Sequence, residues 1–354
     1  MIEARAFAGI VGYGAYIPYY RISVEELAYA RGGDVKRIIS SLAIKEKSVA
    51  GSDEDAVTMG VQAAKNALAR AGIMPNLIGG VYVGSESHPY VVKPSATLVG
   101  QALNIGMQYF AADMEFACKS GTAALQASMA LVLAGMCEYS LAIGSDTAQA
   151  APHDILEYTA SAGAAAFILG RNPAACVALI EKTISISTDT PDFWRRSSQK
   201  YPEHTGRFTA QPAYFYHVVS AARQIFEQNS LKASDFDFVV FHQPNAKFPV
   251  AVAKELGFTQ DQYGPGLLAT EIGNSYSASV LLGLTRILDH AKSGQRILVV
   301  SYGSGSGSDA FIIKTTERIT QVQQKVRTTG DYIKQKKMLT YTGYEKMITG
   351  SKHE

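Results

Sequence analysis

Two stretches of this chain repeat the same pattern of apolar and small residues at an offset of 158 positions, as between Ala63 and Ala221. Four pairs of segments share this offset to within one residue: 63–68 with 221–226, 81–83 with 239–241, 115–118 with 273–276, and 141–144 with 298–301. A constant offset over several segments indicates an internal duplication. We therefore expect two similar halves, with a functional site at their interface that takes residues from each.

Short β-branched runs bounded by glycine alternate with alanine-rich helical stretches in both halves. The expected helices and the strands that follow them are 55–71 before a strand at 81, 120–134 before 141, 212–229 before 238, and a helix from 279 before 297. Gly72 and Gly135 end the first two helices, as glycine often does. This alternation predicts an α/β fold with helices on both faces of its sheets.

The boundary between the halves is placed at 170–173, which gives an N-terminal half of residues 1–172 and a C-terminal half of residues 173–354. A polar and aromatic insertion at about 188–212 has no helical period and contains the one tryptophan of the chain. A loop this long is usually functional or disordered, and its aromatic residues and arginines favour function. The tail after Glu317 is charged and is expected to be partly helical, with no visible chemistry.

Composition limits the class of protein. The 354 residues are 47% hydrophobic and carry a net charge of +2, which gives no argument for a nucleic-acid or membrane partner. No apolar run approaches the roughly 18 residues that span a bilayer, and residues 9–12 read as a strand rather than as part of a secretory leader. Three cysteines cannot form a disulfide framework, which fits a reducing cytosol. We expect a soluble cytoplasmic protein.

Cys118 is the candidate nucleophile. It lies directly before a helix of small residues, whose first turn offers free N–H groups and a partial positive charge, and Lys119 follows it. Both features favour a thiolate. The alternative is a buried, inert cysteine, the interpretation that we keep for Cys137 and Cys176.

His242 and Glu86 occupy matching positions in the two halves. Each follows the end of an expected strand, which is where α/β sheets place their ligands. Without the duplication, a histidine satisfied by the backbone would be an equally good interpretation of His242, and a solvated loop charge would be the usual interpretation of Glu86. With it, both residues become candidates for the site.

Asn274 and a glycine-rich loop complete the candidate residues. Asn274 lies opposite the cysteine segment, so it is a candidate amide donor, although turn formation would also explain it. The loop 303–308 directly follows the strand near 297, which favours a close approach of its backbone to a ligand or to another segment over a flexible linker. It is not a phosphate loop, because no Gly-Lys-Ser/Thr follows it.

These residues together resemble a known family. A duplicated α/β fold with a cysteine in one half and His…Asn in the other is similar to the thiolase superfamily, and within it to the archaeal-type branch of the hydroxymethylglutaryl-CoA synthases. The resemblance covers nearly the whole chain and is carried by VGYGAYIP (11–18), GSESHPY (84–90), EFACK (115–119), TDTPDFW (188–194), FHQPNAKFP (241–249) and GSG (303–305).

The resemblance implies a catalytic mechanism with three residues. Cys118 is expected to accept the acetyl group of acetyl-CoA as a thioester. Glu86 is expected to remove a proton from the acetyl methyl group, and the resulting enolate attacks the ketone of acetoacetyl-CoA. His242 is expected to hold the ketone oxygen and protonate it, and water then releases the product. This reaction supplies the mevalonate pathway of isoprenoid synthesis.

The resemblance also implies the binding residues. Those expected to contact the acyl groups or the second substrate are Asp34, Val35, Thr159, Thr209, Asn274 and Ser304. Arg207 and Lys247 match positions that face the CoA phosphates. The archaeal pattern often has an arginine four residues after the lysine, and Ala251 stands there instead. No cofactor and no metal is expected, because the CoA thioesters are substrates.

The implied fold is a five-layered α/β/α/β/α sandwich, and the implied assembly is a homodimer. Archaeal members of the family form a complex with an acetoacetyl-CoA thiolase and a small zinc-ribbon/OB-fold scaffold protein, so these are expected partners.

Two other functions stay open at this point. A type-III ketoacyl synthase uses Cys-His-Asn and would share the sequence at His242 to Asn245, but it needs no glutamate at Glu86. A catalytically inactive scaffold subunit could use the insertion at 188–212 to bind a partner, although the intact catalytic residues argue against this.

Overall fold

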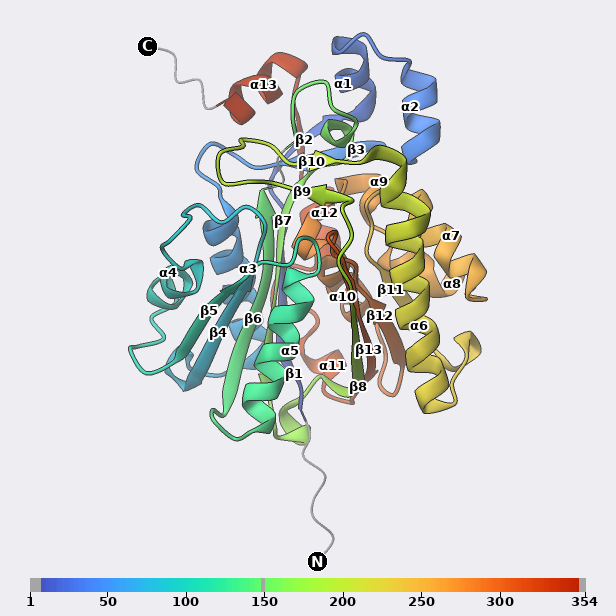
Figure 1. Ribbon diagram of the computed structural model, residues 1–354. Helices are drawn as coiled ribbons and strands as arrows, with labels where there is room; N and C mark the ends of the chain where they lie inside the picture. The colour runs from blue at the N-terminus through green and yellow to red at the C-terminus, as the bar shows by residue number, and fades with distance from the viewer. Residues whose placement is uncertain (1–7, 148–149, 350–354) are drawn as a thin grey trace, which may run out of the picture.

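The structure is a computed structural model that describes residues 8–147 and 150–349, apart from the side chain of Arg207. Its centre is a nine-stranded sheet with the order β11-β12-β13-β8-β1-β7-β6-β4-β5 (Figure 1). The strands of the N-terminal half are β1 (Gly9–Tyr16), β4 (Ile78–Gly84), β5 (Phe110–Met114), β6 (Tyr139–Thr147) and β7 (Ala162–Gly170). Those of the C-terminal half are β8 (Ala178–Ser187), β11 (Phe238–Phe241), β12 (Arg296–Val300) and β13 (Gly307–Thr315).

The strand order confirms the duplication. In each half the first strand, β1 or β8, pairs with the last, β7 or β13, and the next neighbours are β6 and β4 or β12 and β11. The two half-sheets meet where β1 pairs antiparallel with β8, with Gly9 opposite Leu179. Strand β5 extends the N-terminal half-sheet and forms its edge. Each pair of segments with the constant offset therefore falls on equivalent positions of the two halves.

Helices cover the two half-sheets on both faces, which confirms the expected five layers (Figure 1). The outer helices are α3 (Ala56–Ala71) and α4 (Ser95–Ala102) on one side, and α6 (Tyr216–Asn229), α7 (Lys247–Glu255) and α8 (Gln260–Tyr263) on the other. Between the half-sheets lie α5 (Ser120–Leu133) and α10 (Ser279–Leu288), which share one buried apolar core. Separate cores fill the space under the two outer layers.

The helix boundaries follow from local chemistry. Asp55 caps α3 by accepting the backbone N–H of Thr58 at 2.7 Å, and Gly72 ends it in the left-handed conformation (φ 69°). Small residues of α5 allow a close approach of the C-terminal half, because a Cβ atom at Gly121 would lie 2.5 Å from the Ser277 carbonyl oxygen. This contact brings the segment around residue 276 against the start of α5.

The tail after Glu317 returns to the N-terminal half, which the sequence did not indicate. It contains α11 (Ile319–Val322), α12 (Thr329–Lys334), β14 (Lys337–Met338) and α13 (Tyr341–Thr349). Strand β14 pairs with β2 (Tyr20–Ser23) in a small sheet completed by β3 (Glu46–Val49), and α1 (Val24–Ala30), α2 (Val35–Leu42) and α9 (Ala269–Ile272) lie nearby (Figure 1).

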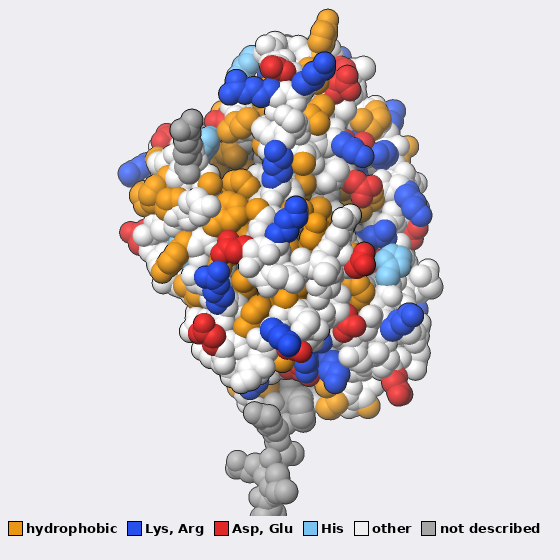
Figure 2. All heavy atoms as spheres, turned by 90° about the vertical axis from the view of Figure 1, so that its right-hand side faces the viewer, with side chains coloured by type: hydrophobic (Ala, Val, Ile, Leu, Met, Phe, Trp, Pro, Cys, Tyr) orange, Lys and Arg blue, Asp and Glu red, His pale blue; other side chains and the backbone are white. Residues whose placement is uncertain are grey.

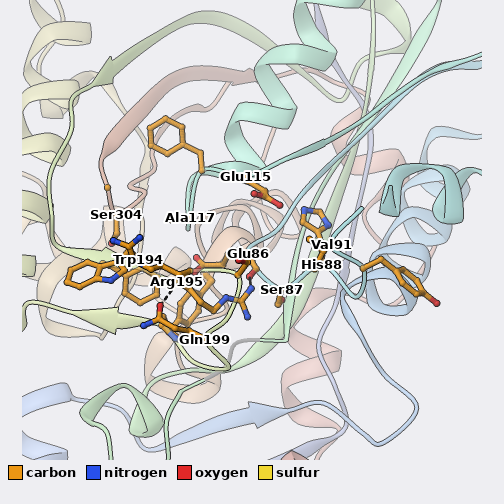
Figure 3. Close-up of a pocket in the computed structure, with 18 residues that line it drawn as sticks. Glu86, Ser87, His88, Val91, Glu115, Ala117, Trp194, Arg195, Gln199 and Ser304 are labelled. Atoms are coloured by element: carbon orange, nitrogen blue, oxygen red, sulfur yellow. Dashed lines mark hydrogen bonds between the residues drawn. The ribbon is translucent and has the colours of Figure 1, made fainter. Parts of the chain in front are cut away.

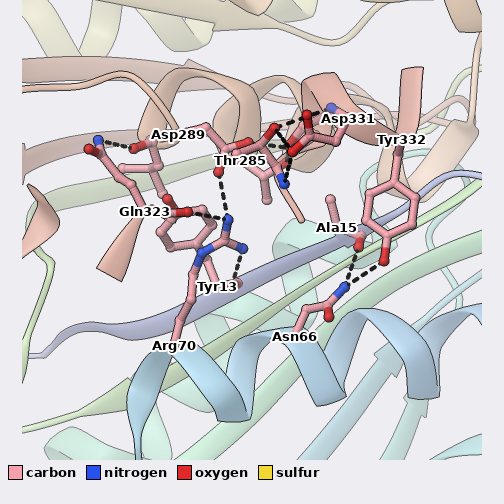
Figure 4. Close-up of polar contacts among 12 residues, drawn as sticks. Tyr13, Ala15, Asn66, Arg70, Thr285, Asp289, Gln323, Asp331 and Tyr332 are labelled. Atoms are coloured by element: carbon pink, nitrogen blue, oxygen red, sulfur yellow. Dashed lines mark hydrogen bonds and ion pairs between the residues drawn. The ribbon is translucent and has the colours of Figure 1, made fainter. Parts of the chain in front are cut away.

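A buried ion pair joins the two halves beneath the sheet (Figure 4). Arg70 of α3 contacts Asp289 at 2.8 Å, and both side chains are almost fully buried. The same guanidinium group donates to the carbonyl oxygens of Tyr13 and Gln323, at 3.0 and 3.1 Å. Asn66, one turn earlier, donates to the hydroxyl oxygen of Tyr332 on α12 at 2.9 Å. Polar contacts thus connect α3 to the C-terminal half and its tail.

The outer surface carries charges of both signs. Figure 2 shows the face that bears α6, α7 and α8, where Lys and Arg are interspersed with Asp, Glu and apolar side chains. In residues 8–147 and 150–349, no helix has the length and apolar character needed to cross a membrane.

Candidate active site

The structure brings two of the three expected catalytic residues into contact. Cys118 lies one residue before the N-cap of α5, and Glu86 lies in the loop that follows β4. The Cys118 Sγ–H group donates to Glu86 Oε1 at 3.3 Å. Ala117, just before the cysteine, has a positive φ of 42°, which an L-residue rarely adopts. The backbone therefore makes a sharp turn at the point where it presents the thiol.

Asp146 fixes the loop that carries Glu86. Its Oδ1 accepts the backbone N–H of Glu86 at 2.9 Å and the hydroxyls of Ser85 and Ser87, while its Oδ2 accepts the N–H of Ser277. Asp146 was not among the residues predicted for the site. A signal was present, because Gly144-Ser145-Asp146 repeats the pattern of Gly84-Ser85-Glu86 at the end of the neighbouring parallel strand.

Burial controls the protonation of both groups. Burial raises the pKa of Glu86 well above its usual value, and Asp146 adds to this, while the hydrogen bond from Cys118 and the charge of Arg195 oppose it. Burial also raises the pKa of the Cys118 thiol, with the adjacent Glu86 as the next cause. In the free protein the thiol therefore keeps its proton.

The expectation that Lys119 favours a thiolate is wrong. Its Nζ lies 3.1 Å from Asp309 Oδ1 and 4.1 Å from the centre of the Phe116 ring. The ammonium group thus pairs with a carboxylate of the other half. The start of α5 alone does not outweigh the burial of the thiol and its nearness to Glu86.

His242 lies at the C-terminal end of β11, as predicted. Its backbone N–H donates to Val300 O at 2.9 Å, and its carbonyl oxygen accepts the Tyr214 hydroxyl at 2.6 Å. The ring packs against the rings of Tyr214 and Tyr302, and burial lowers its pKa to about 3. Its Nδ1 is buried without a hydrogen-bond partner among the described residues. The side chain is therefore a neutral imidazole whose ring is not tied to the protein by Nδ1.

Asn274 pairs through its backbone with the segment 159–161. It forms a bridge in which its N–H donates to Thr159 O at 2.7 Å and its carbonyl oxygen accepts the N–H of Ser161 at 2.9 Å. Its side-chain Oδ1 accepts the N–H of Tyr276 at 2.9 Å. Tyr276 packs in one apolar cluster with Cys118. Asn274 and Thr159 are therefore neighbours, each adjoining a residue of the cluster that holds Cys118, and Asn274 also forms the turn considered as its alternative role.

A cavity of about 670 Å³ opens beside Glu86 (Figure 3). The residues that line it include Glu86, Ala117, Phe193, Trp194, Arg195, Gln199, Tyr276 and Ser304. Four of these belong to the insertion, which contains β9 (Phe193–Trp194) and β10 (Glu203–His204), so the insertion forms part of the wall of this cavity. His242 and Asn274 do not line this cavity.

The glycine loop approaches the cysteine segment closely, as expected. A Cβ atom at Gly303 would lie 2.5 Å from the Phe116 carbonyl oxygen, and the N–H of Gly305 donates to Asp192 Oδ1 at 2.7 Å. The flexible-linker alternative is therefore wrong.

The other expected binding residues lie apart from this cavity. Asp34 is exposed and caps α2 by accepting the N–H of Arg37, and Val35 is the first residue of that helix. Lys247 is the exposed first residue of α7, and Ala251 is exposed one turn later. Helices α2 and α7 meet where the N–H of Ala246 donates to Leu42 O at 3.1 Å.

Thr209 ends a short helix at Gly206–Thr209 and donates to Gly206 O at 2.8 Å. The side chain of Arg207 in the same helix lies outside the described residues. No hydrogen bond or ion pair joins Asp34, Thr209 or Lys247 to Glu86 or Cys118 within the part of the chain that the structure describes.

Two family descriptions match parts of this chain: "Thiolase, N-terminal domain" over residues 39–165, and "3-Oxoacyl-[acyl-carrier-protein (ACP)] synthase III C terminal" over residues 226–315. The hydroxymethylglutaryl-CoA synthase of Archaeoglobus fulgidus is 55% identical over 338 residues, 96% of this chain and 97% of the relative. That of Methanopyrus kandleri is 56% identical over 339 residues, 96% of each chain. The chain belongs to the hydroxymethylglutaryl-CoA synthase family.

Solved structures confirm the thiolase-like fold of this hydroxymethylglutaryl-CoA synthase family member. An HMG-CoA synthase complexed with CoA is 25% identical, with a TM-score of 0.87 over 96% of this chain and 90% of the other. The ketoacyl synthase III of Pseudomonas aeruginosa PAO1 is 20% identical, with a TM-score of 0.80 over 88% of this chain and 99% of the other, and it shows the fold alone. The relatives thus favour the synthase over the ketoacyl-synthase alternative.

Proposed function

We propose that this chain condenses acetyl-CoA with acetoacetyl-CoA and water to give 3-hydroxy-3-methylglutaryl-CoA, through a thioester on Cys118. The observation that carries the proposal is the 3.3 Å contact between the Cys118 thiol and Glu86 beside a cavity. A nucleophile and a base that touch each other are what this two-step reaction needs. The names of the curated relatives support the same reaction.

In the first step Cys118 Sγ attacks the thioester carbonyl carbon of acetyl-CoA. The new C–S bond replaces the bond to CoA, and the thiol proton leaves with the CoA thiolate. Glu86 Oε1 is the acceptor nearest to that proton. Because Glu86 also raises the pKa of the thiol, its removal leaves a thiol that ionises more readily. Acetylation therefore does not depend on Glu86.

In the second step the carboxylate of Glu86 takes a proton from the acetyl methyl group. The resulting enolate attacks the ketone carbon of acetoacetyl-CoA, and water then hydrolyses the Cys118 thioester. A buried carboxylate with a raised pKa is a stronger base than an exposed one, which suits proton removal next to a thioester.

His242 is proposed to stabilise the ketone oxygen during this attack. Because its pKa is about 3, it acts as a neutral imidazole, which donates an N–H hydrogen bond to the growing oxyanion. The alkoxide takes its proton through this imidazole, and the proton that Glu86 removed from the methyl group restores the balance. Asn274, next to Tyr276 and Thr159, is proposed to help place the second substrate.

Substrate contacts outside the catalytic residues stay proposals. Lys247 and Arg207 are proposed to face the CoA phosphates, and the exposure of Lys247 at the first turn of α7 supports its part. Acyl contacts are proposed for Asp34, Val35, Thr159, Thr209 and Ser304, of which Ser304 lines the cavity.

We propose a homodimer formed through the edge strand β5. An unpaired edge strand is a surface that a second chain can extend. Exposed apolar side chains near it support this: Tyr90, Val91, Val92, Met107 and Phe110. Assembly with an acetoacetyl-CoA thiolase and a zinc-ribbon/OB-fold scaffold protein, a cytoplasmic location and a role in the mevalonate pathway remain parts of the proposal.

Intact-mass measurement after mixing with acetyl-CoA tests the nucleophile. The protein is expected to gain a single acetyl group that is absent from the Cys118→Ala variant, and to release free CoA and the six-carbon product when acetoacetyl-CoA is added. An adduct that persists in Cys118→Ala, or that maps to Cys137 or Cys176, contradicts the proposal. Consumption of a carrier-bound malonyl group in place of acetoacetyl-CoA would favour the ketoacyl-synthase function.

A further inference from the structure

Arg195 reaches from the insertion to the loop that carries Glu86. Its Nη2 donates to the backbone carbonyl oxygen of Glu86 at 2.9 Å (Figure 3). Arg195 itself is exposed at the cavity and makes at least one further interaction, so this bond is not its sole anchor.

The segment before Arg195 is firmly held. Asp192 is fully buried and accepts the Tyr302 hydroxyl at 2.6 Å and the N–H of Gly305 at 2.7 Å. Phe193 packs against the ring of Tyr276, with 6.3 Å between ring centres. Because Asp192 and Phe193 are fixed in this way, the backbone at Arg195 is positioned so that its guanidinium group reaches the carbonyl oxygen of Glu86.

The groups that act on Glu86 come from three segments of the chain. Asp146 at the end of β6 and the Cys118 thiol before α5 are the acidic neighbours, and Glu86 in turn acts on the Tyr276 hydroxyl. Arg195 supplies positive charge among these described groups. His88 and Glu115 also line the cavity. Burial and Asp146 favour the neutral form of Glu86, and Arg195 opposes them.

We propose that Arg195 is a positioning residue for the condensation step, which holds Glu86 against Cys118 and keeps its carboxylate in the charged form that a base requires. The inference rests on the proposed function of Glu86. The hydrogen bond fixes the backbone of the loop, and the charge acts on the side chain.

The sign of the effect follows from the charges. Arg195 lowers the pKa of Glu86, so Arg195→Ala raises it. A base acts in its ionised form, so the rate of condensation increases with pH through the pKa of Glu86. The variant is therefore expected to lose roughly tenfold in kcat at the acidic end of the range, because of both charge and misplacement, and less as the pH rises. Its KM is expected to change less than its kcat.

The test compares kcat for condensation against pH in the wild-type protein, Arg195→Ala, Arg195→Lys and Arg196→Ala. Arg196 is the matched control, because it is also exposed at the cavity and carries the same charge, but among the described residues it shows no hydrogen bond with Glu86. Exchange of the acetyl methyl protons of acetyl-Cys118 with deuterated solvent is measured in the same series. Arg195→Lys keeps the charge and is expected to restore most of the wild-type kcat at the acidic end of the pH range. Circular dichroism and thermal melting confirm folding.

An alkaline displacement of the acidic limb in Arg195→Ala, with slower methyl exchange and without the same displacement in Arg196→Ala, supports the inference. Superimposable pH profiles for wild type and Arg195→Ala, or an equal displacement in Arg196→Ala, overturn it. A wild-type protein that acetylates Cys118 but exchanges no methyl protons and makes no six-carbon product overturns the proposed function instead.

Discussion

At the residue scale, burial rather than residue type determines the protonation of the catalytic groups. Sequence patterns identified Cys118, Glu86 and His242, because each follows a strand or precedes a helix in a duplicated frame. They did not predict that burial and Glu86 raise the pKa of the thiol, nor that Lys119 pairs with Asp309 at 3.1 Å. That partner lies in the other half, and no local spacing indicates it.

The same reasoning explains Asp146 and Arg195. Asp146 follows a Gly-Ser pair at the end of its strand, as Glu86 does on the neighbouring strand, so its place at the site could have been predicted from the sequence. The role of Arg195 could not be predicted from the sequence, because its contact with the Glu86 carbonyl depends on the path of an irregular insertion. Local pattern predicts which residues end strands, while contacts across loops need the folded chain.

At the element scale, α7 presents one exposed face to the region where CoA is proposed to bind. Lys247, Ala251 and Lys254 are all exposed on it at positions separated by four and three residues. Residues at this spacing share a helix face. Ala251 therefore stands where a second cation would reinforce Lys247, and the absence of that cation makes the binding of CoA phosphates depend more on Lys247.

Lys247→Ala is expected to raise KM for both CoA substrates through loss of a phosphate contact. The cost is about 1–2 kcal/mol at low salt, and it decreases as salt screens the charge. Steady-state kinetics at several ionic strengths measure it, with Lys65→Ala, an exposed cation of α3 in the other half, as the control. If Lys247→Ala abolishes acetylation even at saturating acetyl-CoA, the residue takes part in the chemistry and its assignment to phosphate binding is wrong.

At the scale of the whole molecule, the duplication predicted the fold. The tail departs from the repeat, because its strand β14 pairs with β2 of the N-terminal half. The repeat fixed which strands and helices are equivalent, and the structure confirms those pairs. The return of the tail to β2 was not predictable, because β14 is only two residues long and pairs with a strand more than 300 positions away. The division at 172/173 remains a prediction, and the tail contacts mean that the halves are not separate bodies.

The Arg70–Asp289 pair is expected to stabilise the contact between the halves. Arg70→Ala leaves a buried carboxylate without its partner, so it should lower the free energy of unfolding by about 3–5 kcal/mol. Chemical denaturation monitored by circular dichroism measures the change. The control is Arg223→Ala, which removes an exposed pair with Glu255 and is expected to cost less than about 1 kcal/mol. Equal effects of the two substitutions would contradict a structural role for the buried pair.

Separation of the two chemical steps in Glu86→Ala tests the central claim most directly. We expect that this variant still gains one acetyl group on Cys118, because loss of the carboxylate lowers the pKa of the thiol. We also expect that condensation falls by about 10²–10⁴-fold, and that exchange of the acetyl methyl protons with deuterated solvent is lost, with Glu86→Gln behaving alike. Condensation near the wild-type rate in Glu86→Ala, or failure of Cys118 to become acetylated, would contradict the role of Glu86 as the base.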